Sequence, residues 1–599
     1  MTPFRNTSRQ SLALIATACL LGVALPAGTA MAQKVKDKSG STASSTATSS
    51  SFSVDIPTID AIDSNLEEAT LRDIFSGNIV DNADALAGLT ATSITIPEII
   101  VTGSTTIEGE TNNATVTFSD LVLSDITDGV AASVSLTGMS LDAGEDGSGE
   151  FGMLSASGLD IGGVLGMYGL VDAAGQTELR TIYTDFSFEG GSFEADDVSC
   201  TMGGMTAAEF KARPLSFSLV EMMALAESLE EQGDDPSPEL LSRALHMYAE
   251  VFTAFESAPA EFAGFDCSGT DDEGRALTFS VANMSMDGMS PGFYPAIAVD
   301  GIDITVEGDG TVQVGNITFK EMDLSGPIAV LASAPARVDE DWFIDNARGL
   351  IPAFAGFAFS DVVFDVPDPD TGERINASIG AFDLSLGRYI NGIPSDVQTT
   401  ASNIVVDLPE DTSDEQIQQL IALGITSIDA GFTFDASWNE AEDTISINDI
   451  SVTGADLATV KLAGTVANAT EALFAVDENE ALAAAMDIAI SQLKLDVTDA
   501  GLSDIILASV AAEQGSDPAT MRPVFAGLAQ GTIVGMLAGT AEAQKVGAAI
   551  NAFVSGKAKY LTIELTAKEE PGLSMTDFMA AESDPASLIG KVTIDASAK

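Results

Sequence analysis

The sequence predicts an α+β fold dominated by β-strands: elongated, bulged antiparallel sheets built from related repeats, with helices packed on one face. Three observations predict it. Apolar and polar residues alternate over long stretches, which is the period of half-buried strands. Turn signals rich in Asp, Gly, Asn and Pro separate these stretches. Several stretches can be aligned with one another, and duplication is the simplest explanation of that similarity.

The clearest unit runs from Leu350 to Gly387 and contains the end of a helix, a long strand, the turn VPDPDTGE and a second long strand. In the second strand Ile375, Ala377 and Ile379 alternate with polar or small residues, and the apolar positions then change phase at Phe382. One extra residue in a strand produces such a slip, so the pattern predicts a β-bulge.

Similar phase slips occur in five further stretches, so the bulges are expected to recur. The slips fall on small or polar residues, which hydrogen-bond locally at low cost. Asp196–Asp197, Gly315–Asn316 and Asn448–Asp449 are examples. The five stretches are residues 116–123, 193–200, 277–286, 312–319 and 445–452.

A chain of 599 residues is too long for one core, and several domains or repeats are expected. Changes in composition and the repeated pattern set the boundaries. The predicted regions are a signal peptide (1–32), a Ser/Thr-rich flexible leader (33–54), an N-terminal β region (55–182), repeat unit 1 with a helical insertion (183–298), repeat unit 2 (299–394), repeat unit 3 (395–492) and a helix-rich C-terminal α+β region (493–599).

The first 32 residues have the organisation of a cleavable signal peptide. Arg5 and Arg9 precede an apolar run, and Ala30-Met31-Ala32 is a small-residue cleavage site, so the mature chain is expected to begin at Gln33. The protein is therefore predicted to be exported and to be periplasmic or extracellular.

Helices are predicted where apolar residues follow a period near 3.6 and capping residues stand at the start. Ser237 with Pro238 opens one such helix, and Ser413 with Gln416 forms a capping box before another. The predicted helices are residues 64–75, 215–233, 237–258, 413–423 and 502–513, with a helical hairpin at 523–554; strands at 560–567 and 591–596 close the chain.

Glycines recur every four residues within the helical hairpin. Small residues at this spacing let two helices approach closely. Close packing of the hairpin is the preferred interpretation, and insertion into a membrane is the alternative. Residues 523–541 carry no charge, but this run barely reaches the length needed to span a membrane. The glycines are Gly527, Gly531, Gly535 and Gly539.

The charge is strongly acidic, with 25 Lys and Arg against 90 Asp and Glu and a formal net charge of −65. Such a field repels nucleic acids and anionic membrane surfaces, so neither is an expected partner. Retention of solubility in a saline setting would also explain the acidic surplus. No membrane span is expected in the mature chain, and the oligomeric state is left open.

Cys200 and Cys267 are the two cysteines left after cleavage of the signal peptide. In an exported protein they suggest one disulfide, which would stabilise the fold by about 4 kcal/mol on the chain-entropy model. Two buried free thiols are the alternative.

Catalytic and metal motifs are weak, and the protein is expected not to be an enzyme and to need no cofactor. His246 is the sole histidine, in a helix, and its expected place is the edge of an apolar stripe. Asp365, Asp368, Asp370 and Glu373 crowd one turn and are a weak calcium candidate, although acidic turns are common in so acidic a chain.

Part of the chain resembles a group of uncharacterised exported proteins of alphaproteobacteria. The resemblance covers mainly residues 395–599, and its motifs are structural: AGFTFDASWN (430–439), TISINDISV (444–452), YLTIEL (560–565), Asp584-Pro585 and LIGKVTI (588–594). More distantly, the organisation is similar to that of AsmA-like and YdgA-like periplasmic proteins, some of which are linked to envelope lipid traffic. The resemblance carries over no functional residue.

Curved sheets backed by helices are expected to form grooves lined by apolar residues, and flexible methionines suit variable apolar ligands. The preferred hypothesis is a non-enzymatic exported protein that binds or shields an apolar or lipid-like envelope component. An acidic, repeat-built structural or adhesive surface protein, rigidified by calcium, is the alternative; a hydrolase ranks third. Ordinary core packing is the alternative role of the four methionines placed at such edges, Met284, Met286, Met289 and Met322.

Overall fold

The computed structural model describes residues 49–107, 110–171, 175–233, 236–271, 274–367, 372, 374–409, 415–537, 539–583 and 586–599. The chain divides into two compact units. Unit 1 extends to Val299 and also includes Ile328–Trp342, and unit 2 consists of Asp300–Pro327 and Phe343–Lys599. The β-dominant α+β class is confirmed. The predicted repeat boundaries stay a prediction.

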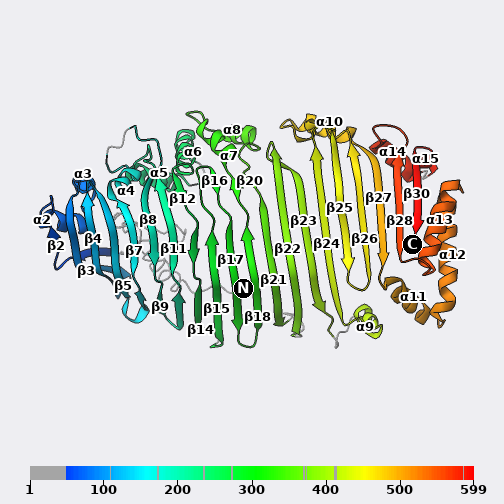
Figure 1. The fold of residues 1–599 in the computed structure, drawn as a ribbon, viewed down its shortest axis with the longest axis horizontal. Coiled ribbons are helices and arrows are strands. Elements are labelled where there is room, and N and C mark those ends of the chain that lie inside the picture. The colour runs from blue at the N-terminus through cyan, green and yellow to red at the C-terminus, as the bar shows by residue number, and fades with distance from the viewer. Residues whose placement is uncertain are drawn as a thin grey trace, which may run out of the picture. The chain divides into compact units, whose positions relative to one another are not determined.

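Unit 1 contains an antiparallel sheet in which several long strands are each broken into two collinear pieces (Figure 1). Side by side, its members are β3, β4, β5, then β7 with β6, β8 with β9, β11 with β10, β13 with β14, and β15. Their bounds are β3 Ala91–Ile107, β4 Glu110–Thr127, β5 Val130–Asp142, β6 Ser148–Phe151, β7 Leu154–Asp160, β8 Arg180–Phe188, β9 Gly191–Ala195, β10 Val198–Met202, β11 Met205–Ala212, β13 Ala260–Phe262, β14 Phe265–Thr270 and β15 Ala276–Met286.

The breaks of neighbouring strands lie side by side, and each break contains a glycine. We call this line of four residues the glycine crease (Gly152, Gly190, Gly203 and Gly264). The backbone still pairs there, since Gly152 donates to the carbonyl of Gly190 and Gly203 to that of Gly264, both at 2.8 Å. Gly190 and Gly264 have φ of 93° and 72°. A Cβ atom on Gly264 would lie 1.9 Å from a carbonyl oxygen, so only glycine fits.

One end of unit 1 is closed by short helices. The helices α2 (Glu68–Phe75), α3 (Ala83–Ala87) and α4 (Ile161–Met167) contribute apolar side chains to the core over β3 and β4. Leu71 and Ile74 of α2 are fully buried, because they occupy the inward face of that helix.

Ser49–Asp55 forms β1, which pairs with β3, and Asp60–Ile62 forms β2, which pairs with β3 farther along. The leader predicted at residues 33–54 therefore extends too far. Residues 49–54 are Ser-rich, but they pair with β3 as a strand. Residues 33–48 lie outside the described residues.

The helical insertion of unit 1 consists of α5 (Leu219–Gln232) and α6 (Pro238–Val251), followed by β12 (Phe255–Ser257). Residues 328–342 return from later in the chain and attach to α6. The Ser242 hydroxyl donates to the Pro335 carbonyl at 2.7 Å, and the Val338 amide donates to the Pro238 carbonyl at 3.0 Å. Val338 is fully buried, so this segment completes the unit.

Unit 2 contains an antiparallel sheet of ten strands, each paired with the next in the order β18, β21, β22, β23, β24, β25, β26, β27, β28 and β30 (Figure 1). Their bounds are β18 Gly310–Phe319, β21 Gly356–Pro367, β22 Arg374–Ile390, β23 Ile393–Asp407, β24 Ser427–Asn439, β25 Thr444–Gly454, β26 Ala458–Ala467, β27 Ala489–Asp499, β28 Tyr560–Ala567 and β30 Val592–Ala598.

Short strands complete the pairing. In unit 2, β19 (Met322–Asp323) pairs with β20 (Ala353–Phe354), and β29 (Leu573–Ser574) pairs with the start of β27. The strands β16 (Phe293–Tyr294) and β17 (Ile297–Val306) and the helices α7 (Ser325–Ala332) and α8 (Glu340–Asn346) lie at or near the unit boundaries in the sequence.

The helices of unit 2 differ in position. The helix α13 packs on β28 and β30, whereas α9, α10 and α14 lie at the ends of the strands (Figure 1). In the part of the chain that the structure describes, none of the helices combines the length and the apolar character that crossing a membrane requires. The bounds are α9 Glu415–Ala422, α10 Glu478–Asp487, α11 Leu502–Glu513, α12 Pro518–Met536, α13 Ala541–Val554, α14 Met575–Ser583 and α15 Ala586–Ile589.

The predicted bulges are only partly correct. A register shift does occur in β25 at Asn448–Asp449. Asp196–Asp197 is instead the two-residue turn between β9 and β10, because Ala195 pairs directly with Val198. At Gly315–Asn316 the register between β18 and β21 is unchanged on both sides.

A different device produces the phase slip at residues 116–123: a residue with left-handed backbone conformation. Asp120 has φ of 50°, and Phe118 and Leu121 on either side of it pack into the same core. Within the described residues, all but one of the non-glycine residues with positive φ are Asp or Asn, whose short polar side chains tolerate this conformation. Asp361 and Asn403 hold equivalent places in unit 2.

The expectation for the glycine stripe was wrong. The predicted hairpin exists as α12 and α13. A Cβ atom added at Gly527, Gly531 or Gly535, however, would have no neighbouring atom within 4 Å. The close approach between the helices uses Gly547 of α13, where a Cβ atom would lie 2.8 Å from Val534. The periodic spacing predicted a packed face and could not indicate which face of α12 meets α13.

Candidate functional site

The ten-stranded sheet of unit 2 carries an apolar row that crosses every strand. Residues paired directly on neighbouring strands lie on the same face, so the registers define the row. A second row runs beside it, two residues along each strand, from Phe319 to Ala596. The first row consists of Ile317, Phe359, Phe382, Ala401, Phe432, Val452, Val460, Val497, Leu561 and Ala598.

Only part of this apolar face is covered. At the β27–β30 end, Val546 and Ala549 of α13 pack against Leu561 and Ala596, and all four are buried. On β18 and on β24 to β26 the same rows meet solvent: the exposed fractions are 52% for Phe319, 39% for Phe432, 36% for Phe434, 62% for Val452 and 45% for Val460. Their members on β21 and β22 are half-buried, and Ala401 on β23 is buried. Large apolar side chains that are exposed next to one another are typical of binding surfaces.

The other face of the same strands is polar and internally paired. Lys461 binds Asp449 at 2.6 Å, and Lys494 binds Asp496 at 2.7 Å. Burial opposes ionisation of Asp496, but hydrogen bonds from Lys494 and Thr562 outweigh it and lower the pKa of this carboxyl. The sheet of unit 2 is therefore amphipathic: one face carries paired charges, and the other face carries the apolar rows.

A pocket of about 270 Å³ opens where β23 bulges against β24. The bulge places Ser402 and Asn403 opposite the single residue Gly431, and Asn403 has φ of 52°. Ala401 and Phe432, which are neighbours in the first apolar row, line this pocket. Gly431, Thr433 and Thr453 also line it, and these residues alternate with the apolar row along β24 and β25, so the hollow opens mainly towards the polar face.

Unit 1 has rows of the same kind. One of them starts in the core, where Ile96 and Leu121 are buried, and reaches solvent at Met205, which is 38% exposed. The covered end lies under α2 and α3. This row consists of Ile96, Leu121, Leu136, Leu154, Phe188, Met205, Phe262 and Met284.

The Cys200–Cys267 pair lies in another row of unit 1. The two residues face each other at a directly paired position of β10 and β14, with their Cα atoms 4.1 Å apart and their sulfurs bonded. Phe193 and Phe279 flank them on the adjoining strands. The structure therefore contains the predicted disulfide, inside an apolar surface.

The methionines predicted to edge a groove do not form one cluster. Met284 belongs to the apolar row of unit 1, and Met286 pairs with Ala260 beside it. Met289 makes an isolated bridge with Ser257, and Met322 belongs to unit 2, where it pairs with Phe354.

The His246 side chain is engaged by the backbone of its own helix. Its Nδ1 lies 2.7 Å from the carbonyl oxygen of Ser242, one turn earlier in α6, and donates a hydrogen bond to it. The Ser242 hydroxyl is itself bonded to Pro335. Both side chains therefore serve the structure of α6.

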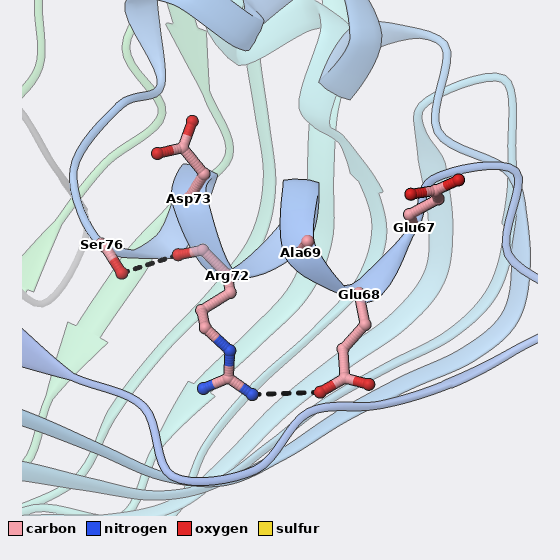
Figure 2. A pocket seen from close by; sticks show the side chains of 6 residues that line it. All are labelled: Glu67, Glu68, Ala69, Arg72, Asp73 and Ser76. Carbon is pink, nitrogen blue, oxygen red and sulfur yellow. Dashed lines mark hydrogen bonds and ion pairs between the residues drawn. The ribbon is translucent and has the colours of Figure 1, made fainter.

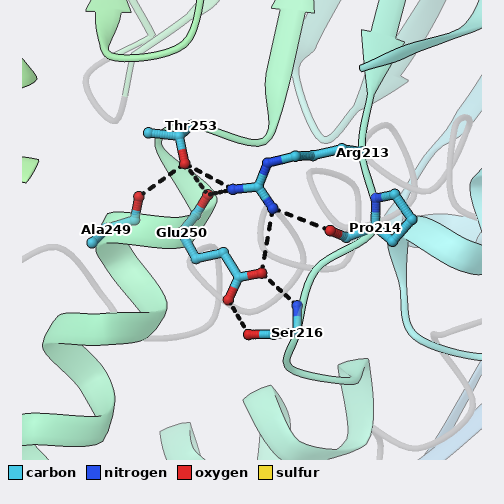
Figure 3. Close-up of polar contacts among 6 residues, drawn as sticks. All are labelled: Arg213, Pro214, Ser216, Ala249, Glu250 and Thr253. Carbon is cyan, nitrogen blue, oxygen red and sulfur yellow. Dashed lines mark hydrogen bonds and ion pairs between the residues drawn. The ribbon is translucent and has the colours of Figure 1, made fainter. Parts of the chain in front are cut away.

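A polar cluster near the C-terminal end of α6 ties that helix to β11 (Figure 3). The guanidinium of Arg213 donates to the Thr253 hydroxyl at 2.8 Å and to the Glu250 carbonyl at 3.3 Å, and it forms an ion pair with the Glu250 carboxylate. The Ser216 amide and hydroxyl donate to the same carboxylate. A cation at a helix C-terminus is favourable, so this cluster is an anchor.

Figure 2 shows a hollow of about 700 Å³ over α2, which the sequence did not predict. Two of its three carboxylates, those of Glu68 and Asp73, are engaged within the protein. Glu68 pairs with Arg72 at 3.0 Å, and Asp73 accepts hydrogen bonds from Asn78 and Asn82. The hollow is thus a largely self-paired polar surface.

The calcium candidate remains a prediction. Asp365 lies at the end of β21, and its carboxylate accepts a hydrogen bond from Arg374 Nε at 2.8 Å. Asp368, Asp370 and Glu373 lie outside the described residues. Among the described residues no group of three or more His, Cys, Asp or Glu side chains has an arrangement that would hold a metal ion.

Comparison with known proteins gives one match to part of the chain and no activity. The model of a protein family described as "Uncharacterized protein" matches residues 451–599, which contain the covered end of the unit 2 sheet and the helices around it. No curated protein matches the chain. The resemblance to exported alphaproteobacterial and AsmA-like proteins stays a prediction.

Proposed function

We propose that this protein is an exported, non-enzymatic binder that shields an apolar or lipid-like component of the cell envelope. The observation that carries the proposal is the pair of rows on unit 2. The first is apolar on all ten strands, the second is interrupted by Thr399 on β23, and their large side chains are exposed on β18 and on β24 to β26. The paired charges of the opposite face leave this side of the sheet as the one available to an apolar ligand.

The rows have dimensions suited to an extended chain. The seven strands from β18 to β26, separated by about 4.8 Å, span roughly 29 Å. Each methylene that leaves water contributes about 0.8 kcal/mol, so a ligand that covers ten methylenes would gain about 8 kcal/mol before the entropic cost of binding.

Export rests on the sequence of the first 32 residues and on the chemistry of the disulfide. Disulfides persist in oxidising compartments, which include the periplasm and the extracellular space. The acidic surplus favours neutral or zwitterionic ligands over anionic ones, since like charges repel.

The test begins with mass spectrometry of the protein purified from its native host and extracted with organic solvent. A bound lipid or other apolar molecule is expected. Titration with a fluorescent zwitterionic phospholipid then locates the site. Val452→Gln with Val460→Gln is expected to weaken binding about tenfold, because two large apolar contacts are lost.

The matched control is Ser451→Gln, which introduces the same side chain next to Val452 on the polar face. This variant is expected to bind as the natural chain does. Equal affinity in all three proteins, together with a native preparation free of apolar molecules, would overturn the proposal and leave a structural or adhesive role.

A further inference from the structure

Two helices at the end of the unit 2 sheet expose large apolar side chains at helical spacing. On α10, Leu482 is 62% exposed and Met486 69% exposed. On α14, Met575 is 56% exposed and Met579 66% exposed. Residues four apart lie on the same face of a helix, so each helix presents one apolar stripe to solvent. We call these four residues the methionine patch.

The register of the short strands brings the two helices to one place. Ala489, two residues after the end of α10, pairs directly with Ser574, the residue before α14 begins. The Asn468 side chain also binds the carbonyl of Asp487, the last residue of α10, at 2.9 Å. Both helices therefore lie at the same end of the sheet (Figure 1).

The surroundings of the patch are acidic. Glu478, Glu480 and Asp487 of α10 are exposed, and so are Glu569 and Glu570, which precede β29. Two lysines close to these elements in the sequence are occupied. Lys591 forms an ion pair with Asp577, and Lys568 donates to the carbonyl of Gly590 at 3.3 Å.

We propose that the methionine patch docks a cationic amphipathic helix of a partner protein. The apolar side of such a helix would cover the four side chains, and its lysines and arginines would meet the carboxylates around them. Unbranched methionines adapt to different apolar surfaces, which suits helix binding. A second copy of this chain and an anionic lipid surface are both disfavoured, because each would bring negative charge to an acidic rim.

The site lies apart from the exposed rows of the sheet and goes beyond the proposed function, so the two can fail independently. The probe is a fluorescein-labelled synthetic helix with leucines on one face and lysines on the other, titrated into the full chain and followed by anisotropy. Met486→Gln with Met579→Gln is expected to weaken binding about tenfold, because glutamine keeps the length of the side chain and loses its apolar character.

The matched control is Met536→Gln on α12, where the methionine is 62% exposed but belongs to another helix. This variant is expected to bind the probe as the natural chain does. A scrambled peptide with the same charge and no apolar face is expected to bind more weakly to the natural chain. Glu478→Gln with Glu480→Gln should reduce the dependence of affinity on salt.

Three results would overturn the proposal. The first is equal binding of the probe to the natural chain and to the double methionine variant. The second is self-association in sedimentation velocity that the double methionine variant loses, which would assign the patch to a second copy. The third is flotation with zwitterionic phosphatidylcholine vesicles that the double methionine variant loses, which would assign the patch to a lipid surface.

Discussion

Gly315 on β18 lies opposite Asp361 on β21, so close that a Cβ atom on the glycine would come within 2.8 Å of the Cβ of the aspartate. Asp361 has φ of 53°, and the register on both sides of the pair is the same. Gly380 on β22 stands in the same relation to Asn403 on β23, at 2.9 Å. Neighbouring strands therefore change phase together, and the ladder keeps its register.

Replacement of Gly315 by alanine is expected to destabilise unit 2 by about 1–3 kcal/mol, because the added methyl overlaps Asp361 and the backbone has to move. Calorimetry should show a lower unfolding temperature. Gly527→Ala is the matched control: no atom lies within 4 Å of the new methyl, and alanine stabilises a helix by up to about 1 kcal/mol relative to glycine. Equal unfolding temperatures for the two variants would contradict the paired change of phase.

Two substitutions in one apolar row should differ sharply in their cost. Leu561→Ala removes a buried side chain under α13 and is expected to cost about 2–5 kcal/mol. Val452→Ala, in the same row, is expected to stay within about 0.5 kcal/mol of the natural chain, because Val452 is 62% exposed. Urea denaturation measures both. A large cost at Val452 would mean that this part of the row is covered in solution.

Loss of the disulfide should destabilise unit 1. Cys200 and Cys267 are 67 residues apart, and the chain-entropy model gives about 4 kcal/mol for a loop of that length. The variant Cys200→Ala with Cys267→Ala should unfold at a lower temperature than the natural chain and should not respond to reducing agent. Two free thiols in the untreated natural protein would contradict the assignment.

Asp577 should make part of the stability of unit 2 depend on pH. The ion-paired hydrogen bond from Lys591, with those from Ser574, lowers the pKa of this carboxyl to about 2. A lowered pKa stabilises the folded state above the unfolded pKa of about 4, and this contribution is lost as the pH falls from about 4 to about 2.

The difference in unfolding temperature between the natural chain and Asp577→Asn should therefore be largest above pH 4 and should shrink towards pH 2. In a Lys591→Gln background Asp577→Asn should have a smaller effect, because the Asp577 carboxylate has already lost its main partner, Lys591. A difference that stays constant with pH would rule out the carboxylate as its source.

Local patterns in the sequence were enough to predict most elements of the fold. The alternation around Ile375 and Phe382 predicted a long strand with a change of phase, and the capping residue Ser237 with Pro238 marked the start of α6. What failed was the cause of the phase slips, because a left-handed Asp and an inserted residue leave the same trace in one strand. The difference lies in the register with the neighbour.

The candidate site could not be predicted for the same reason. Phe432, Val452 and Val460 are adjacent in one row, but the chain places them twenty and eight residues apart, so their neighbourhood depends on pairing across strands. Coverage by α13 is also a tertiary property. Sequence patterns indicated which residues of each strand are apolar, and the fold decided which of them are left in water.

The attachment of Pro335 and Val338 to α6 affects the order in which the protein can mature. A ribosome that has just released Ser242 must add 93 more residues before Pro335 exists to accept its hydrogen bond. During that interval the surface that later holds Val338 stays open to water. A nascent chain of this protein thus has a period of vulnerability to proteases and chaperones that ends only when translation has passed well into the second unit.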